Sequence, residues 1–290
     1  LIVLGSGLDE RDTMHWTLRP AGRITVDLDV AALGAGGSDG AVVGDCGAYL
    51  AFLLEAAPRI DEAMMSAAAA RSAWLDDILA TPRLEAPDEM SSAAIPIHPG
   101  RIVAELRAVF PRDGILLVDS GAHRAFAGHY WTAYAPRTYV SATNLGPMGW
   151  AIPAAIGVQC ARPDRKVAVI TGDGCMRMHG IEVATAARYG LPVVFVVFDN
   201  GALGNVWLRA HTEGPVPDAL TRLPDVDWAG FGRSLGCAGE TVRHPDELAS
   251  AFARALASDG PTVVDVKTDR TVRTPVSDWS AATAAWSYHE

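Results

Sequence analysis

Asp173 and Asn200 supply a carboxylate and an amide oxygen, and each lies just after an apolar run that predicts a buried strand. The runs span 167–171 and 193–198 and are rich in β-branched residues, as strands of a parallel sheet are. A helical pattern over 182–189 lies between them. This order predicts a right-handed β-α-β unit, with both polar side chains at the carboxyl ends of parallel strands, where ligands bind in open α/β sheets.

The two side chains match the ligand preferences of Mg²⁺, which takes one or two protein carboxylates and completes its shell with phosphate oxygens and water. The triplet Gly172-Asp173-Gly174 forms a turn that can bring backbone N–H groups next to a ligand. Such a triplet alone is more often a plain tight turn. The spacing favours a ligand site, because Asn200 follows Asp173 by 27 positions, with a helix and a strand between them.

The composition limits the class of protein. The chain has 290 residues, 49% of them hydrophobic, and a net charge of −10 without a basic patch. These values indicate about two globular domains and argue against a nucleic-acid partner. No apolar run approaches the roughly 20 residues of a membrane span. The four cysteines form no CxxC pair, which argues against zinc and indicates a reducing, cytoplasmic location.

Alternating strand and helix patterns predict an α/β protein with two parallel-sheet domains. Residues 1–80 have the pattern of the later part of one such domain. Residues 81–99 are rich in proline and serine, which predicts a linker. Residues 100–275 predict a complete, doubly wound second domain, and the tail 276–290 has no clear pattern.

Two features near the Asp173 turn have predicted structural roles. Cys175 is expected to be a small buried residue rather than a nucleophile, because no partner base is evident in the sequence. Residues 206–228 contain Pro215, Pro217 and Pro224, and we expect a loop or lid over the site there.

The stretch 167–205 resembles the thiamine-diphosphate motif, in which GDG precedes a pair of asparagines by roughly 24–27 residues. Asp199 stands here in the place of the first asparagine, and Asn200 retains the second. GPMGWAIPAAIG, at 146–157, resembles the GxMGxxxPAAIGA element of acetolactate synthase-like enzymes. The chain is therefore similar to the thiamine-diphosphate-dependent enzymes of that family.

The amino-terminal part also resembles this family. GLDER (7–11), followed by ITVDLD (24–29), is similar to the middle domain, although Leu8 and Glu10 replace the usual Phe and Asp. The resemblance implies that 1–80 is a partial middle domain and that 100–275 is the pyrophosphate-binding domain. Some members hold FAD in the middle domain, so flavin contact and a plain structural role are both open for Asp9, Arg11 and Asp29.

The resemblance implies a site for thiamine diphosphate and Mg²⁺. The metal would be held by the Asp173 carboxylate, the Asn200 side-chain oxygen and the Ala202 carbonyl. In catalysis, Met148 would be the wedge that bends the cofactor, and the Gly146 carbonyl would accept a hydrogen bond from its exocyclic amine. The implied cofactor-binding residues are Ala122, His123, Gly146, Met148, Gly172, Asp173, Gly174, Cys175, Asn200, Ala202 and Leu203.

Two of these assignments have structural alternatives. Met148 could be an ordinary core methionine, which is the usual role of this residue. His123 could be a capping or structural histidine. Ala122 lacks the glutamine side chain that the family has beside this histidine, so only its backbone contact is implied.

The implied activity is that of an acetolactate synthase-type carboligase, which decarboxylates pyruvate and joins the remaining two carbons to a second 2-oxo acid, as in branched-chain amino acid biosynthesis. The family's Gln-Trp-Gln run, which shapes the acceptor site, is absent after Val206. A 2-oxo acid decarboxylase or another thiamine-diphosphate C–C lyase is therefore an alternative. A non-catalytic partner subunit has no need of Asp173 and Asn200, and a nicotinamide enzyme would need a GxGxxG opening that the chain lacks.

The family activates its cofactor with a glutamate from a separate pyrimidine-binding domain. Beyond the two predicted domains, we find no further α/β domain in the sequence that could supply it, and Glu182 is expected to be structural. The isolated chain is therefore expected to be inactive without a pyrimidine-binding domain or chain that supplies the glutamate. The cofactor lies between subunits in this family, which implies a homo- or hetero-oligomer, at least a dimer, or a tetramer.

Overall fold

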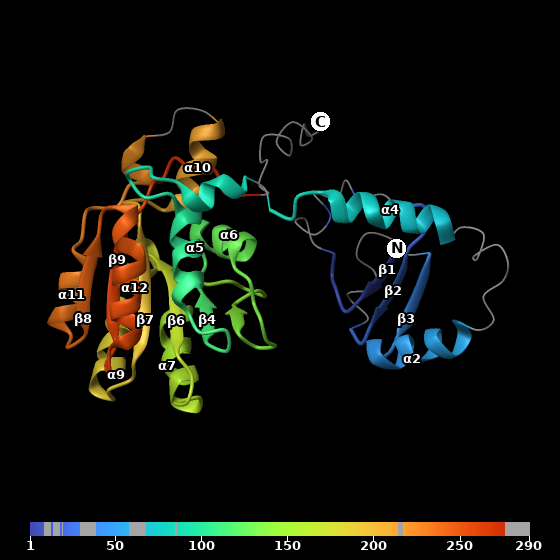
Figure 1. Ribbon diagram of the computed structural model, residues 1–290, viewed down its shortest axis with the longest axis horizontal. Helices are drawn as coiled ribbons and strands as arrows, with labels where there is room; N and C mark the ends of the chain where they lie inside the picture. Colours follow the sequence, from blue (N-terminus) through green and yellow to red (C-terminus); the bar gives the residue numbers. More distant parts are fainter. Residues whose placement is uncertain are drawn as a thin grey trace. The chain divides into compact units, whose positions relative to one another are not determined.

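The computed structural model describes residues 1–8, 13, 18, 20–29, 39–57, 68–84, 86–213 and 217–275. The described residues divide into two compact units, one within Leu1–Arg83 and the other beginning at Leu84. Each unit has its own parallel sheet, of three and of six strands (Figure 1). The predicted α/β class with two parallel sheets is thereby confirmed. Among the described helices, none is long and apolar enough to cross a membrane.

The second unit is built on the six-stranded sheet, in which all neighbouring strands run parallel. The strand order is β5-β4-β6-β7-β9-β8. The inner strands are almost entirely buried, which explains their continuous apolar sequences. The strands are β4 (Ile115–Val118), β5 (Tyr139–Ser141), β6 (Val167–Gly172), β7 (Val193–Asp199), β8 (Ala238–Val242) and β9 (Thr262–Lys267).

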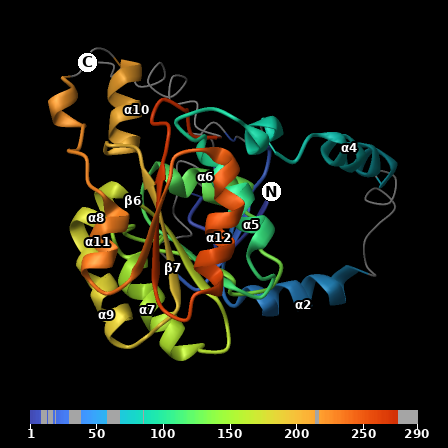
Figure 2. The same cartoon turned by 60° about the vertical axis from the view of Figure 1, so that its left-hand side comes forward.

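Helices cover both faces of this sheet. Successive side chains of a strand point to opposite faces, so Val196 and Val197 belong to two different apolar cores. Figure 2 shows the helices on the two sides of β6 and β7. One core includes α5 (Pro99–Val109), α6 (Ala122–Tyr130) and α12 (Leu248–Ala257), and the other includes α7 (Ala151–Ala161), α9 (Val183–Arg188) and α11 (Trp228–Ser234).

The strand order reverses between β4 and β6. From β4 the chain adds β5 on one side, and then returns to add β6 on the other. Such a reversal opens a crevice at the carboxyl ends of the strands. Asp119 follows β4, Asp173 follows β6 and Asn200 follows β7, so all three lie at the edge of the sheet where a ligand is expected.

The segment after β6 differs in detail from the prediction. Helix α8 (Asp173–His179) begins directly after the strand, so the glycine triplet is the start of a helix rather than an isolated turn. A carboxylate in the first turn is favourable there because it faces the positive end of the helix dipole. A short 3-10 turn (Gly180–Glu182) then leads into α9, which corresponds to the predicted helix 182–189.

The predicted loop 206–228 is partly helical. Helix α10 (Gly204–Glu213) occupies its first part. The prolines that favoured a loop all come after this helix, and the described ones, Pro217 and Pro224, flank the short turn η4 (Asp218–Leu220). A proline beyond the carboxyl end of a helix is common, and it says little about the residues before it.

Part of the predicted linker 81–99 packs with the second unit. Residues Pro87–Ser91 form a short 3-10 helix, η2. Ile97 is fully buried in the second unit, and its N–H donates to the carbonyl of Lys267 at 2.9 Å. The tail 276–290 lies outside the described residues.

The first unit contains β1 (Ile2–Leu4), β2 (Ile24–Asp27) and β3 (Gly40–Val43), paired in that order. Its described helices, α2 (Cys46–Ala56) and α4 (Ala68–Ala80), contain no buried residue. Of the residues considered for flavin contact, Asp9 and Arg11 lie outside the described residues, and Asp29 is exposed.

Candidate functional site

Asp173 is a buried carboxylate at the junction of β6 and α8. Its side chain is only 4% exposed. One carboxylate oxygen accepts a hydrogen bond from the N–H of Gly174 at 2.9 Å, and the other accepts from the N–H of Ala202 at 3.2 Å. The carboxylate is therefore fixed between the strand that carries it and the turn that follows β7.

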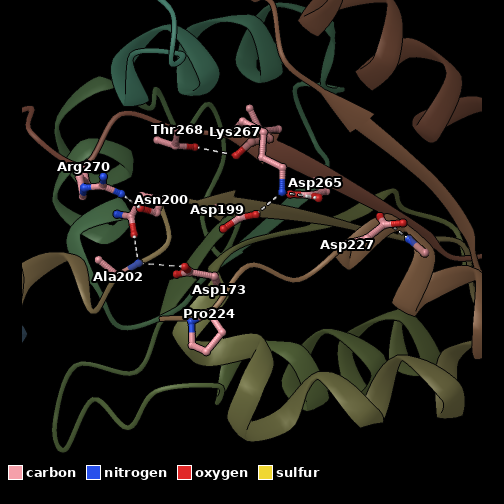
Figure 3. A network of polar contacts seen from close by, with 12 residues as sticks. Asp173, Asp199, Asn200, Ala202, Pro224, Asp227, Asp265, Lys267, Thr268 and Arg270 are labelled. Carbon is pink, nitrogen blue, oxygen red and sulfur yellow. Dashed lines mark hydrogen bonds and ion pairs between the residues drawn. The ribbon is translucent and has the colours of Figure 1, made fainter. Parts of the chain in front are cut away.

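Asn200 lies in that turn and points to the same place. Its side-chain oxygen accepts a hydrogen bond from the N–H of Ala202 at 3.1 Å, so the Asp173 and Asn200 oxygens converge on one backbone N–H (Figure 3). The turn is held from behind, because the N–H of Leu203 donates to the carbonyl of Thr221 and Ala202 forms an antiparallel bridge with Arg222.

The buried position of the Asp173 carboxylate perturbs its ionisation. Burial, together with the nearby charge of Asp199, raises the pKa of Asp173 to about 7, while hydrogen bonds from the N–H groups of Gly174, Ala202 and Gly201 act in the opposite direction. A buried carboxylate without a counter-charge favours its neutral form. A cation bound to it would restore the charged form, so the site is suited to a divalent ion.

Asp199, the residue that replaces an asparagine of the motif, is compensated by a lysine. Lys267 lies directly opposite Asp199 in the β7–β9 register, and its ammonium pairs with Asp199 and, at 3.0 Å, with Asp265 (Figure 3). Burial lowers the pKa of Lys267, but the hydrogen bonds to both carboxylates outweigh it and the pKa is raised. Burial raises the pKa of Asp265 to about 6. This ion-pair network compensates the negative charge of Asp199, the residue directly before Asn200.

The residues after β9 also hold the turn. The N–H of Thr268 donates to the carbonyl of Asp199 at 2.9 Å, and the Nη1 atom of Arg270 donates to the carbonyl of Asn200 at 3.0 Å. The backbone of the turn is thus fixed by the segment after β9, which is far away in the sequence.

A cavity of about 240 Å³ opens beside these residues. It includes most of the residues that the sequence predicts to bind the cofactor, while Gly146 is absent from its described lining. Gly146 has a positive φ of 64°, which a glycine adopts without strain. The predicted residues that line the cavity are Ala122, His123, Met148, Gly172, Asp173, Gly174, Cys175, Asn200, Ala202 and Leu203.

Met148 and Gly174 lie against each other in this cavity. A Cβ atom at Gly174 would lie 2.8 Å from the terminal methyl of Met148 and 3.1 Å from a methyl of Leu203. A larger residue at this position would therefore require the flexible Met148 side chain, and to a smaller extent Leu203, to shift. Met148 is thus a wall of the cavity and is not part of either apolar core.

His123 is buried with an unused nitrogen. Its side chain is 7% exposed, and its Nε2 atom has no hydrogen-bond partner among the described residues. Burial lowers the pKa of His123 to about 4, against the opposing charge of Asp119. The imidazole is therefore neutral at physiological pH, and it offers one nitrogen to a ligand in the cavity.

Asp119 is a site residue that the sequence analysis does not identify. It is 1% exposed, and it accepts hydrogen bonds from the Ser120 N–H at 2.9 Å, from the Gly149 N–H at 2.8 Å and from the Thr171 hydroxyl at 2.9 Å. It thereby ties the Met148 segment to the ends of β4 and β6. Its place after an apolar strand, in Asp119-Ser120-Gly121, is the signal that could have found it.

Two further groups of cavity residues are absent from the predicted set. The start of α10 contributes Gly204, Asn205, Val206 and Leu208, and the segment after β9 contributes Arg270 and its neighbours. The start of α10 overlaps the segment 206–228 that the sequence predicts to cover the site, and it follows the Asn200 turn directly. No local motif marks the segment after β9, which reaches the cavity because β9 lies beside β7 in the sheet.

Cys175 is buried, as predicted. Its thiol donates to the carbonyl of Ser120 at 3.1 Å, and burial raises its pKa to about 12. A thiol with this pKa is almost entirely protonated at neutral pH, so it is a poor nucleophile. Cys175 lines the cavity in a structural role.

The donor set fits a diphosphate held by a hard divalent cation. The described residues contain no group of three His, Cys, Asp or Glu side chains that could hold a metal ion. One carboxylate, one amide oxygen and one backbone carbonyl suit Mg²⁺, which retains phosphate oxygens as its remaining ligands. His123, with its unpaired nitrogen, and Gly174 line the same cavity.

Comparison with known proteins identifies the family. Residues 119–266, about half of the chain, match the model of the "Thiamine pyrophosphate enzyme, C-terminal TPP binding domain". The acetolactate synthase large subunit of Parasynechococcus marenigrum (strain WH8102) is 33% identical over 277 residues, which are 93% of this chain and 43% of that protein. A putative thiamine pyrophosphate-containing protein, YdaP, of Bacillus subtilis (strain 168) is 34% identical over 176 residues, 61% of this chain and 30% of that protein.

A solved structure agrees with this result. The thiamine diphosphate-dependent 4-hydroxybenzoylformate decarboxylase of Rhodococcus jostii RHA1 superimposes with a TM-score of 0.67 and 26% identity, over 86% of this chain and 44% of that one. The chain thus spans less than half the length of these relatives. The matched region contains Asp119, Asp173 and Asn200. The chain belongs to the thiamine pyrophosphate enzyme family and, within it, is similar to acetolactate synthase large subunits.

Proposed function

We propose that this chain forms the diphosphate-binding part of a thiamine-diphosphate- and Mg²⁺-dependent 2-oxo acid carboligase of the acetolactate synthase type. The observation that carries the proposal is the convergence of the Asp173 and Asn200 oxygens on the Ala202 N–H at the edge of a cavity. The similarity to acetolactate synthase large subunits supports the reaction class.

In this proposal each site residue has a defined task. Asp173, Asn200 and the Ala202 carbonyl hold Mg²⁺, and the backbone around Gly174 and the neutral His123 contact the diphosphate. Met148 supports the cofactor in a bent shape, and the Gly146 carbonyl accepts a hydrogen bond from its amine. When bound, the cofactor supplies the electron sink that allows a 2-oxo acid to lose CO₂. The apolar walls of the cavity exclude water from the reacting carbons.

The proposed activity requires a second component. Among the described residues that line the cavity, no glutamate is present. We propose that a pyrimidine-binding domain or chain supplies the activating glutamate, and that the working unit is at least a dimer. All four cysteines are free, which is consistent with the expected cytoplasmic location.

A 2-oxo acid decarboxylase is the second candidate. The start of α10 presents Leu208 to the cavity where the first glutamine of the Gln-Trp-Gln run is expected in acetolactate synthases. A solved relative is itself a decarboxylase. Product analysis with pyruvate separates the two reactions, because ligation yields acetolactate and simple decarboxylation yields acetaldehyde.

Calorimetric titration of thiamine diphosphate, with and without Mg²⁺, tests the site. The wild-type chain with its pyrimidine-binding partner should bind only when Mg²⁺ is present, and Asp173→Ala should abolish that binding. Asp164→Ala is the matched control, because Asp164 is exposed and pairs with Arg162 away from the cavity. Metal-independent binding that survives Asp173→Ala would refute the site. Tight binding without turnover of any 2-oxo acid would instead favour a non-catalytic partner subunit.

A further inference from the structure

Arg270 lines the cavity, and the proposed function has so far given it no task. It follows β9 and shares the cavity wall with Asp173, Asn200 and Ala202. Its Nη1 atom donates to the Asn200 carbonyl at 3.0 Å (Figure 3). A Cβ atom at Gly201 would lie 3.7 Å from the same nitrogen. The guanidinium therefore lies against the turn that carries the candidate metal ligand.

The charges of the cavity single out this residue. Among the described residues that line it, Arg270 is the one lysine or arginine. His123 adds no positive charge near neutral pH, because burial keeps its pKa at about 4. Asp173 and Asp269 are the acidic residues of the lining, and the Asp269 carboxylate accepts hydrogen bonds from the N–H and hydroxyl of Thr271 at 2.8 and 2.7 Å.

We propose that Arg270 binds the diphosphate group of the cofactor alongside the divalent cation, a role that rests on the proposed function. A diphosphate carries more negative charge near neutral pH than one divalent cation neutralises, since its terminal phosphate is largely doubly ionised. The Asp173 carboxylate increases that imbalance. Arg270 supplies the missing positive charge.

The geometry of the guanidinium suits this task. An arginine offers five N–H donors, and the contact to Asn200 uses one of them. The remaining donors form a planar fork that matches phosphate oxygens. The carboxylate of a 2-oxo acid is the other anion in the proposed reaction. The diphosphate is the better match, because Arg270 contacts the backbone of a metal ligand and the metal itself binds phosphate oxygens.

Titration of the full chain with inorganic pyrophosphate and Mg²⁺ tests the proposal, since this probe needs no pyrimidine-binding partner. Arg270→Gln should weaken binding by about 10- to 100-fold, the range expected for lost charged hydrogen bonds. The pyrophosphate affinity of Arg270→Gln should also depend less on salt concentration than that of the wild type. Arg270→Lys should be intermediate, because it keeps the charge but loses the fork. The matched control Arg209→Gln removes an exposed arginine of α10 that does not line the cavity, and it should bind like the wild type.

Equal affinity of the wild type and Arg270→Gln, both folded by circular dichroism, would overturn the proposal. Two further measurements exclude other roles. Mn²⁺ binding without pyrophosphate, followed by electron paramagnetic resonance, should not weaken in Arg270→Gln, and a matching loss would mean that Arg270 only positions Asn200. Loss of pyruvate affinity with pyrophosphate binding intact would assign the residue to the substrate instead. Failure of the wild type to bind Mg²⁺-pyrophosphate would overturn the proposed function together with this inference.

Discussion

The body of the six-stranded sheet and its carboxyl edge differ in the kind of side chain that they bury. In the body, the apolar side chains of β4, β6 and β7 are buried and fill two cores. At the edge, four carboxylates are also almost completely buried: Asp119, Asp173, Asp199 and Asp265. Burial of apolar groups stabilises the fold, whereas burial of charges opposes it unless they are paired. Lys267 pairs with Asp199 and Asp265, and three donors satisfy Asp119, so Asp173 is the carboxylate of the four that a bound cation would stabilise most.

The largest effect is expected from a change in the body. Phe195 is fully buried in β7, so Phe195→Ala should lower the free energy of unfolding by about 3–5 kcal/mol through the cavity that it leaves. Urea denaturation measures this loss, and the milder Phe195→Leu serves as the control. Pyrophosphate affinity should be retained at low temperature. A variant that lost binding but kept its stability would erase the contrast between body and edge.

The next effect concerns the buried imidazole at the edge. The pKa of His123 is about 4 in the folded state, against an ordinary value of 6.5 in the unfolded state. Between these pH values the imidazole is protonated in the unfolded state and neutral in the folded state. Stability should therefore fall as the pH is lowered through this range, with this residue contributing up to about 3 kcal/mol. Urea denaturation at several pH values should show a shallower decline for His123→Gln. His179→Gln, at an exposed position of α8, is the control, and an identical slope in all three proteins would contradict the prediction.

Removal of the Asp119 carboxylate should affect both stability and binding. Asp119→Ala leaves the Gly149 N–H and the Thr171 hydroxyl without their acceptor, and we expect a loss of about 2 kcal/mol. Asp119→Asn keeps an acceptor oxygen, so it should lose less. Thermal unfolding measures the stability, and pyrophosphate titration reports the site. If Asp119→Ala left both unchanged, the carboxylate would not be what ties the Met148 segment to the sheet.

The smallest effect has the opposite sign. Asp173→Asn removes a negative charge that is buried beside Asp199, and the chain without ligand should become more stable by about 1 kcal/mol. The same variant should lose Mg²⁺-dependent binding. Asp164→Asn, at an exposed position, should change neither property. A less stable Asp173→Asn would show that this carboxylate belongs with the stabilising body after all.

The same contrast explains how far the sequence is informative. The apolar runs 167–171 and 193–198 predict β6 and β7 because a buried parallel strand is apolar throughout. The spacing of Asp173 and Asn200 identifies them as candidate metal ligands, because a single β-α-β unit places both at the same edge of the sheet. Both signals are local in the sequence.

The missed residues depend on contacts between distant segments. Asp119 reaches Gly149 and Thr171 across 30 and 52 positions, and Arg270 reaches Asn200 across 70. These contacts follow from the strand order, which places β6 between β4 and β7 and sets β9 beside β7. Helix α10 differs from the predicted loop because the prolines that favour a loop in 206–228 lie after the helix and do not constrain its residues.

The position of α10 separates two properties of the cavity. Its first turns add the apolar residues Val206 and Leu208 to the wall of the cavity. The polar residues Asp173 and Asn200 line the same cavity from the ends of β6 and β7. We infer that substitutions at Val206 and Leu208 would alter which molecule is accepted more than how the cofactor is retained, whereas Gly204, at the start of α10, packs against the Asn200 side chain and belongs to the proposed metal site. Choice of substrate and retention of cofactor can then diverge independently among descendants of one ancestral sequence.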